Sequence, residues 1–333
     1  MKSSPSEQKY LRQSYLRQRY LQQPVFRRGK GLHSGLEYGL SIEPSDGPLS
    51  LCLEGGEALP LSRFSLEGGG RGSDLIFPDE SPFARKRVRT CEHVLSALAG
   101  MGVWRAKLTV SGTEAGSPGF LEMPGLDGCA EGLAREILEK SAPVGDASVR
   151  GSPVREKAEL APFRPAFPVH SGGVAFADPS RTEPSQTGTP RTDPPRFAVA
   201  LPSPFFHVTC VIDYAAAPIG TRIFEYGGGP EDYLEEIAPA RTFVMREDIE
   251  ALRSAGLALG GSLDSAVVVD AAGTETAGGL RFPDEFVRHK VLDLLGDLAC
   301  LGRPLAAHVI AVRAGHAQHL QLTEKLRSVL GGA

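Results

Sequence analysis

The longest helical pattern in the chain is PDEFVRHKVLDLLGDLACL, which occupies residues 283–301. Pro283 suits a first helical turn, and the carboxylates of Asp284 and Glu285 complement the positive end of the helix dipole. Gly302 follows the last apolar residue and begins the turn sequence Gly-Arg-Pro, which ends the helix. The pattern therefore predicts one long helix with well-defined ends.

One stripe of this helix carries polar groups. At about 100° per residue, His289, Asp293 and Asp297 fall within about 80° of one another. The apolar side chains of the opposite face are Val287, Val291, Leu294, Leu295 and Leu298. Periodicity alone favours a solvated outer face for the polar stripe. The stripe also contains Phe286, Gly296 and Cys300 where an exposed surface would have Lys and Glu, which indicates instead that another part of the chain covers it.

If the stripe is covered, it can form part of a metal site. His289 and Asp293 have the i,i+4 spacing of a chelating pair, and zinc accepts both imidazole nitrogen and carboxylate oxygen. A catalytic zinc takes three protein ligands, so a third must come from elsewhere. His93 is a candidate, because it follows Glu92, a candidate general base, at the start of a helix that we expect Thr90 to cap. By itself, such a Glu-His dipeptide is more often a surface pair.

His316 completes the set of candidates. It follows a predicted strand in the sequence Arg-Ala-Gly-His, where Gly315 permits a turn that points the ring inward. A histidine at the end of a strand is usually structural. Asp297, one helical turn beyond Asp293, could however orient this ring and hold it protonated as an acid.

The remaining pattern predicts two α+β domains, at residues 24–142 and 197–333. In the first domain the expected strands include 38–42 and 107–110, and the expected helices are 90–99 and 128–139. In the second domain we expect strands at 198–201, 207–214, 265–269 and 308–312, and helices at 246–254, 283–301 and the C-terminus. Residues 143–196 are rich in Pro, Ser and Thr and are interpreted as a linker with an insertion. A parallel α/β sheet is disfavoured, because the phosphate-binding glycine fingerprint is absent.

Residues 1–23 are interpreted as an appended basic tail. Residues 1–30 carry eight Lys or Arg against one Glu, and Tyr10, Tyr15 and Tyr20 recur every five residues, which fits neither the helical nor the strand period. A solvated, flexible or partly helical extension is the favoured interpretation. The alternative is a basic surface that contacts acidic lipid headgroups or a partner.

Bulk composition narrows the class of partner. The chain has 333 residues and a net charge of -4, so it has no global attraction to nucleic acid or anionic lipid, and we expect a small-molecule partner and a monomer. Five scattered cysteines without a CxxC pair argue against a disulfide framework and against a thiolate zinc site, and they fit the cytoplasm. No stretch approaches the roughly 18 to 20 apolar residues that span a bilayer, and the N-terminus lacks the apolar core of a signal peptide. We therefore expect a soluble protein with no stable membrane insertion.

Several short segments occur in a fixed order along the chain, although each of them is a weak signal by itself. In the first domain they are GKGLHSG at 29–35, TCEH at 90–93, EMP at 122–124 and DG at 127–128. In the second they are RTF at 241–243, GLALGG at 256–261, DEFVRHK at 284–290, LD at 292–293, GDL at 296–298 and GH at 315–316. In this order they resemble the signature blocks of UDP-3-O-acyl-N-acetylglucosamine deacetylase, a zinc amidase of lipid A biosynthesis. The match runs from about residue 28 to residue 327, without the tail and the Pro-rich insertion.

The resemblance implies a fold and a catalytic site. The fold is two α+β domains, each a β-sheet layered with helices, with the helices packed between the two sheets. The implied zinc ligands are His93, His289 and Asp293. The implied catalytic groups are Glu92 as general base, His316, oriented by Asp297, as acid or electrostatic partner, and Thr242 as a donor to the oxyanion. Zinc lowers the pKa of water to about 7, a carboxylate takes its proton, and an imidazolium protonates the departing amine, so that acetate and a free sugar amine result.

The resemblance also implies how the acylated UDP-sugar binds. Lys290 and Arg313 would face the diphosphate, and Phe243 would be a further contact with the substrate. The family has an apolar passage for the acyl chain, and the matching positions are Ile249, Leu263 and Val268, which would otherwise be ordinary core residues.

The chain departs from the family's pattern at two places. Arg246 stands where the passage is usually apolar, and residues 213–218 lack a histidine that is common in that block. The acyl-chain length and part of the nucleotide contact are therefore open. Two rival interpretations also stay open: a non-catalytic protein that senses the UDP-lipid, although no metal or acid-base position is lost, and a zinc hydrolase of another acetylated sugar nucleotide.

Overall fold

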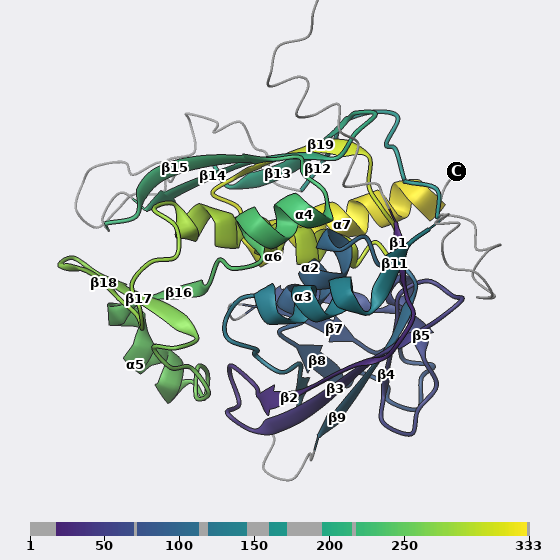
Figure 1. Ribbon diagram of the computed structural model, residues 1–333, viewed down its shortest axis with the longest axis horizontal. Helices are drawn as coiled ribbons and strands as arrows, with labels where there is room; N and C mark the ends of the chain where they lie inside the picture. The colour runs from purple at the N-terminus through teal and green to yellow at the C-terminus, as the bar shows by residue number, and fades with distance from the viewer. Residues whose placement is uncertain are drawn as a thin grey trace, which may run out of the picture.

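The computed structural model describes residues 18–69, 72–112, 119–144, 160–171, 195–214 and 218–331. Two five-stranded sheets form the outer layers of the molecule, and helices fill the space between them (Figure 1). This arrangement confirms the α+β fold with helices between two sheets.

The first sheet is built from the N-terminal half of the chain. Its strand order is β2 (Val25–Lys30), β3 (Glu37–Pro44), β9 (Ala106–Gly112), β4 (Ser50–Leu53) and β5 (Leu59–Pro60). Neighbours are antiparallel except β4 and β9, which are parallel. Residues of β3 alternate between buried and partly exposed, so Tyr38, Leu40 and Ile42 face the helices, as the period of two predicts.

The second sheet repeats this topology with the C-terminal half. Its order is β12 (Val169–His170), β13 (Phe197–Pro202), β19 (Ala307–Val312), β14 (His207–Tyr214) and β15 (Gly220–Tyr226). Again only one pair, β14 and β19, is parallel. In each sheet, a strand that comes late in the sequence of its half lies between two earlier strands: β9 lies between β3 and β4, and β19 lies between β13 and β14.

The helices follow the same repeat. In the first half, α2 (Glu92–Gly100) precedes the inserted strand and α3 (Glu131–Glu139) follows it; in the second, α6 (Glu285–Ala299) precedes and α7 (His316–Gly331) follows. These four helices lie in the central layer, together with the short α4 (Pro230–Asp232) and a π-helical turn over Tyr233–Ile237. Within the described residues no helix is long and apolar enough to cross a bilayer.

Each half also carries a small inserted sheet. In the first half it consists of β6 (Ser65–Gly69), β7 (Gly72–Ile76), β8 (Arg87–Arg89) and β10 (Leu121–Glu122). In the second half it consists of β16 (Thr242–Met245), β17 (Ala266–Asp270) and β18 (Gly273–Glu275), with α5 (Arg246–Ser254) beside it. Figure 1 shows this second insertion at the left edge of the molecule, next to the start of α6.

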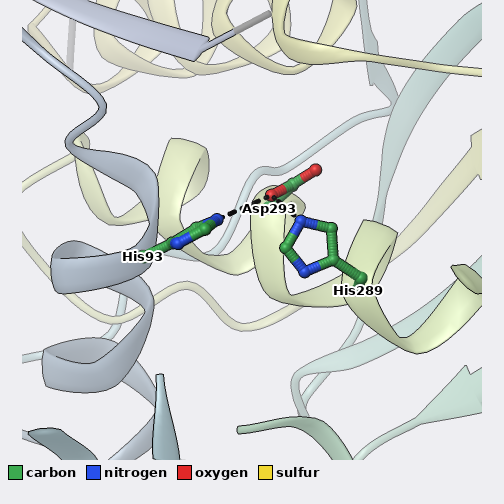
Figure 2. A group of neighbouring side chains, drawn as sticks. All are labelled: His93, His289 and Asp293. Atoms are coloured by element: carbon green, nitrogen blue, oxygen red, sulfur yellow. Dashed lines mark ion pairs between the residues drawn. The ribbon is translucent and has the colours of Figure 1, made fainter. Parts of the chain in front are cut away.

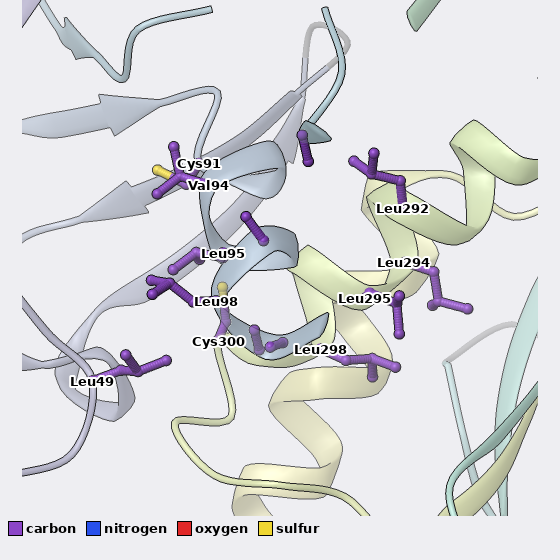
Figure 3. Packing of buried hydrophobic residues seen from close by; sticks show 14 of the residues in the cluster. Leu49, Cys91, Val94, Leu95, Leu98, Leu292, Leu294, Leu295, Leu298 and Cys300 are labelled. Atoms are coloured by element: carbon purple, nitrogen blue, oxygen red, sulfur yellow. The ribbon is translucent and has the colours of Figure 1, made fainter. Parts of the chain in front are cut away.

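The core is centred on the contact between α2 and α6. The labelled leucines of α2 lie on one side of this contact and those of α6 on the other (Figure 3), and all belong to one cluster of buried side chains that also includes residues of both large sheets. Gly296 makes the close approach possible, because a Cβ atom there would lie 2.0 Å from the carbonyl oxygen of Glu92. The polar stripe of α6 is therefore covered by α2, as the Phe, Gly and Cys residues within it indicated, and is not the solvated face that periodicity alone favoured. His289, Asp293 and Asp297 are at most 2% exposed.

The predicted helices and strands agree with the observed ones to within a few residues, but two local expectations were wrong. Thr90 does not cap α2; its backbone has a φ of 56°, and its hydroxyl donates instead to Glu122 at 2.9 Å. The left-handed residue of the turn before α7 is Arg313, with a φ of 50°, and not Gly315.

Two segments differ from the proposed division of the chain. Residues assigned to the end of the tail form strand β1 (Arg19–Leu21), which pairs with β11 (Ser141–Pro143). Strand β12 lies inside the range that was interpreted as a linker. Tyr10, Tyr15 and most of the Pro-rich insertion lie outside the described residues.

Candidate metal and acid-base site

Three side chains from α2 and α6 converge on one point. Figure 2 shows His93 of α2 facing His289 and Asp293 of α6. The Nε2 atoms of His93 and His289 lie 3.8 and 3.2 Å from Oδ1 of Asp293, and the three ligand atoms are all within 4.8 Å of one another. The structure thus brings together the pair predicted on one helix and the third ligand predicted elsewhere.

The two imidazoles are ready to donate lone pairs. Burial lowers the pKa of His93 to about 3 and also lowers the pKa of His289, so both rings are neutral at pH 7. Nδ1 of His289 donates to the carbonyl oxygen of Ala240 at 3.0 Å, which leaves the lone pair of Nε2 directed at Asp293. This arrangement, in which the other ring nitrogen donates to a carbonyl, is typical of metal-binding histidines.

Asp293 supplies the negative charge of the group. Burial alone would raise its pKa, but His289, Lys290 and His316 outweigh burial and hold the pKa well below its ordinary value. Lys290 donates to Oδ2 at 2.8 Å, which leaves Oδ1 facing the two histidines. Two neutral imidazoles and one carboxylate fit a divalent metal ion with a further position open to solvent or substrate.

Glu92 lies next to this group and is buried. The backbone N–H of Ser73 donates to its Oε2 at 3.0 Å, which fixes one oxygen of the carboxylate. Burial, together with the nearby charges of Asp297 and Asp293, raises the pKa of Glu92 to about 7. A carboxylate with this pKa can accept a proton near neutral pH and release it again.

His316, the first residue of α7, is held by Asp297. Its Nδ1 lies 2.9 Å from Oδ2 of Asp297, and its Nε2 points toward Asp293 at 3.7 Å. Burial would lower the pKa of His316, but Asp297 and Asp293 outweigh it and raise the pKa to about 9. The ring is therefore a cation at pH 7 and can act as an acid.

A cavity of about 250 Å³ opens onto these groups. Thr242 and Phe243 of β16 form part of its wall, together with Glu92 and His93. The backbone N–H of Thr242 donates to the carbonyl oxygen of Gly128 at 2.8 Å, which attaches the start of β16 to the first half of the chain. The cavity is thus enclosed by both halves.

A second, larger cavity of about 560 Å³ adjoins the first, and Leu32, Thr242 and Phe243 line both. Ile249, Leu263 and Val268, the positions matched to the acyl passage, all line the larger cavity. Arg246, the departure from the family's pattern, lines it too.

A third cavity, of about 220 Å³, lies on the other side of His316 and is basic. It shares Lys290 and His316 with the central cavity and adds Arg313 and Arg196. Nη1 of Arg313 lies 3.6 Å from Oδ2 of Asp213, so the carboxylate of Asp213 partly neutralises the charge of Arg313. The three cavities adjoin in the order basic, metal-binding and largely apolar.

Sequence reasoning missed two groups that hold the acid in place. Ser73 contacts both Asp297 and Nδ1 of His316, and His319 contacts Oδ2 of Asp297 at 2.9 Å. His319 could have been found, because it is three residues after His316 on a helix and shares its face. Ser73 lies on strand β7, in the other half of the chain from Asp297, and nothing in the sequence around Ser73 indicates that the two residues are in contact.

Comparisons with known proteins agree with this geometry. The family described as UDP-3-O-acyl N-acetylglycosamine deacetylase matches residues 18–161 and 181–328. Among curated proteins, the UDP-3-O-acyl-N-acetylglucosamine deacetylase of Myxococcus xanthus is 33% identical over 90% of this chain and 83% of its own length. The proteins of the same name from Thermosynechococcus vestitus and Synechocystis are 33% and 30% identical, and cover 90% and 91% of this chain and 90% and 96% of their own lengths.

Both the extent of these matches and the ordered segments around the metal group lead to one assignment. The residues that converge in the structure come from the segments that first suggested the resemblance, at 90–93, 241–243, 284–298 and 315–316. This chain belongs to the UDP-3-O-acyl-N-acetylglucosamine deacetylase family.

Proposed function

We propose that this chain hydrolyses the N-acetyl group of UDP-3-O-acyl-N-acetylglucosamine in lipid A biosynthesis, with zinc as its metal, and releases acetate and a free sugar amine. One observation carries the proposal: three metal ligands, a carboxylate base and a protonated imidazole all face a single cavity. Amide hydrolysis requires these groups, because water must lose a proton and the amine must gain one.

His93, His289 and Asp293 would hold the zinc ion. Zinc, when bound, acts as a Lewis acid and makes water a nucleophile near neutral pH. Three protein ligands and an open position are the arrangement of catalytic rather than structural zinc sites.

Glu92 acts as the general base. With a pKa of about 7, its carboxylate is sufficiently ionised at neutral pH to take a proton from the attacking water. The hydrogen bond from Ser73 holds one oxygen and leaves the other to face the cavity.

His316 and Thr242 act on the other atoms of the amide. The imidazolium of His316 is positioned by Asp297 and protonates the departing sugar nitrogen. The hydroxyl of Thr242, which lines the same cavity as Glu92, donates to the oxygen of the former carbonyl as negative charge develops on it.

The neighbouring cavities orient the substrate. Lys290, Arg313 and Arg196 form a basic pocket suited to the diphosphate, because ammonium and guanidinium groups donate charge-assisted hydrogen bonds to phosphate oxygens. The larger cavity, which is lined by Phe243, Ile249, Leu263 and Val268, accepts the acyl chain. The acetamide then lies between the two anchors, over the metal ligands.

Further proposals concern the state and place of the protein. All the groups named above come from one chain, which supports a monomer as the active unit. All five cysteines lie among the described residues, where they are buried and unpaired, which supports a reducing compartment such as the cytoplasm. The division into domains at 24–142 and 197–333 is supported by the two large sheets, each of which draws most of its strands from one of these ranges.

The test combines metal analysis with an assay of acetate release. We expect the purified protein to contain one zinc ion per chain and to release acetate from UDP-3-O-acyl-N-acetylglucosamine. The Glu92→Ala variant should retain zinc and lose activity by roughly 10²- to 10⁴-fold, because it lacks only the base. His93→Ala, the matched control on the next residue, should lose the metal as well.

Two outcomes would contradict the proposal. Stoichiometric zinc without acetate release from this substrate would overturn it, and a panel of other acetylated sugar nucleotides would then test the rival hydrolase. Tight binding of the UDP-lipid without turnover of any substrate would instead support a sensor.

A further inference from the structure

The wall of the larger cavity is a strip of sheet that leads away from the metal group. Thr242 and Val244 alternate along β16 and line the cavity, and their partners in β17 are Ala266 and Val268, which also line it. Thr242 faces the metal cavity as well. The strip therefore begins at the catalytic groups and continues with small and aliphatic side chains.

The strip ends at a group of charged side chains. Arg246 is four residues beyond Thr242 and, at the rise of a strand, lies about 13 Å further along the wall. Its Nε donates to Oδ2 of Asp270 at 2.7 Å, and Nη2 contacts Glu275. Glu275 belongs to β18, lies opposite Val268 and lines the cavity too.

Asp270 holds the Arg246 guanidinium in a fixed position. Its Oδ1 accepts hydrogen bonds from the backbone N–H groups of Ala272 at 2.8 Å and Gly273 at 3.1 Å, in the turn that joins β17 to β18. One carboxylate oxygen is thus tied to the hairpin, and the other is free to hold the guanidinium. The Arg246 side chain, 49% exposed, is thereby fixed over the end of the strip instead of extending into solvent.

We propose that the cluster of Arg246, Asp270 and Glu275 sets the upper limit on the length of the acyl chain that this enzyme accepts. The inference rests on the proposed function and deepens it: the preferred substrate carries a fatty acyl chain that ends before the cluster. A longer chain must place methylene groups against a guanidinium and two carboxylates and remove water from them. Each of these exposed ion pairs is weak, so the limit comes from this desolvation and from the space that Arg246 fills.

The test is the acyl-length profile of Arg246→Met. Methionine keeps an unbranched side chain of similar reach and replaces the guanidinium over the end of the strip with an apolar group, and the two carboxylates lose the partner that holds them there. We would measure kcat/KM for acetate release, and Kd, for a series of UDP-3-O-acyl-N-acetylglucosamines from short to long chains. The ratio of long- to short-chain kcat/KM should rise by about tenfold or more, since a single methylene in an apolar pocket changes this ratio by that order.

Two further variants identify the cause. Arg135→Met removes an arginine from another exposed ion pair, with Glu131 on α3, which lines none of the three cavities, so its profile should match that of the unmodified protein. The double variant Asp270→Asn, Glu275→Gln frees the guanidinium, so it should relax the length limit as Arg246→Met does. It also tests the inference independently if Arg246→Met does not fold.

The outcomes separate this inference from the function on which it rests. Absence of acetate release at every chain length would overturn the proposed function, while the Kd series would still report the length limit. The same length profile for Arg246→Met and the unmodified protein, in both Kd and kcat/KM, would overturn the role of Arg246. An equal shift in Arg135→Met would show that only the net charge of the protein matters and would overturn the role of the cluster.

Discussion

In the proposed mechanism Glu92 and His316 have opposite roles, because the raised pKa of the carboxyl group still lies below the raised pKa of the imidazole ring. Burial raises the pKa of the Glu92 carboxyl to about 7, and the carboxylates of Asp297 and Asp293 raise the pKa of the His316 ring to about 9. Between these values the base is ionised and the acid is protonated. Both groups therefore have the protonation state that their role requires only between a pH of about 7 and a pH of about 9.

This predicts a bell-shaped dependence of kcat/KM on pH. Activity should rise as pH increases through about 7, because Glu92 must lose its proton to act as base, and fall through about 9, because His316 must keep its proton to act as acid. The measurement is kcat/KM for acetate release across this range. His316→Gln should be less active and should lose the descending limb; a descending limb that persists in this variant would exclude His316 as its source.

Glu122 organises the approach to the same site without lining its cavity. Its buried carboxylate accepts hydrogen bonds from the backbone N–H groups of His33 at 2.7 Å and Ser34 at 3.0 Å, and from the hydroxyls of Ser34 and Thr90. Thr90, in a left-handed conformation, comes two residues before Glu92. Glu122 thus holds together the strained entry to α2 and the 31–35 turn.

Replacing Glu122 should therefore cost stability and metal affinity together. Glu122→Ala leaves several buried donors without an acceptor, and we expect the free energy of unfolding to fall by about 3 kcal/mol. Denaturant titration measures this loss, and metal competition measures the affinity. Glu139→Ala, on the exposed side of α3, serves as control and should change stability by no more than about 0.5 kcal/mol. Equal losses in both variants would contradict a specific role for Glu122.

The sequence could identify most of the reacting residues but not their proximity. The helical period placed His289, Asp293 and Asp297 on one stripe, because that angle depends only on the local backbone. It could not say that α2 covers the stripe, since this depends on packing between segments about 200 residues apart. The order of family segments supplied that connection, and for Ser73 neither source gave a signal.

Among the elements, the contact between α2 and α6 depends most on a single residue. Gly296 has no side chain, and the carbonyl group of Glu92 occupies the space where a Cβ would be. The metal ligands lie on either side of this contact, with His93 on one helix and His289 and Asp293 on the other. A change in the spacing of the two helices would therefore change the distance between ligands.

Gly296→Ala should weaken both the fold and the metal site. Alanine favours a helix by about 1 kcal/mol over glycine, but the overlap with backbone atoms of Glu92 should outweigh this, with a net loss of about 2 kcal/mol. Denaturant titration and metal competition are again the measurements. Gly132→Ala in α3 is the matched control: a Cβ there meets nothing within 4 Å, so the protein should become slightly more stable. Stabilisation by both substitutions would mean that the helices separate at no cost.

Elements with a strong local pattern were predicted well. The helices at 246–254 and 283–301 and the strand at 207–214 correspond to α5, α6 and β14, because their apolar period and end signals are local. In the inserted sheets the strand expected at 265–269 corresponds to β17, but the other short strands and the π-helical turn at Tyr233–Ile237 were not predicted. These elements have few residues each, and their pairing partners, not their own sequence, determine their conformation.

In the whole molecule, two halves of the same topology share one layer of helices. The cluster of buried apolar residues extends from the strands of the first sheet through α2 and α6 to the strands of the second. A half that separated from the other would expose the facing surfaces of these helices to water. The two halves should therefore unfold together.

Cooperative unfolding can be tested with the single tryptophan. Trp104 is 2% exposed and belongs to the first half, so its fluorescence reports on that half alone, whereas far-ultraviolet circular dichroism reports on both. In a denaturant titration we expect the two transitions to coincide, since the halves share their core. Separate midpoints would mean that each half has a stable core of its own.

In the proposed function, the division of the metal ligands between α2 and α6 makes the ion a link between the halves and ties stability to metal concentration. An unfolded chain does not hold His93 beside His289 and Asp293, so a metal ion that binds the folded state favours it by mass action. The melting temperature should rise with free zinc: at a concentration 100 times Kd, the gain is about 2.7 kcal/mol. A chelator should reverse this gain in the unmodified protein and have no effect in His93→Ala. The folded fraction of this protein in a cell would thus depend on how much zinc the cell leaves unbound.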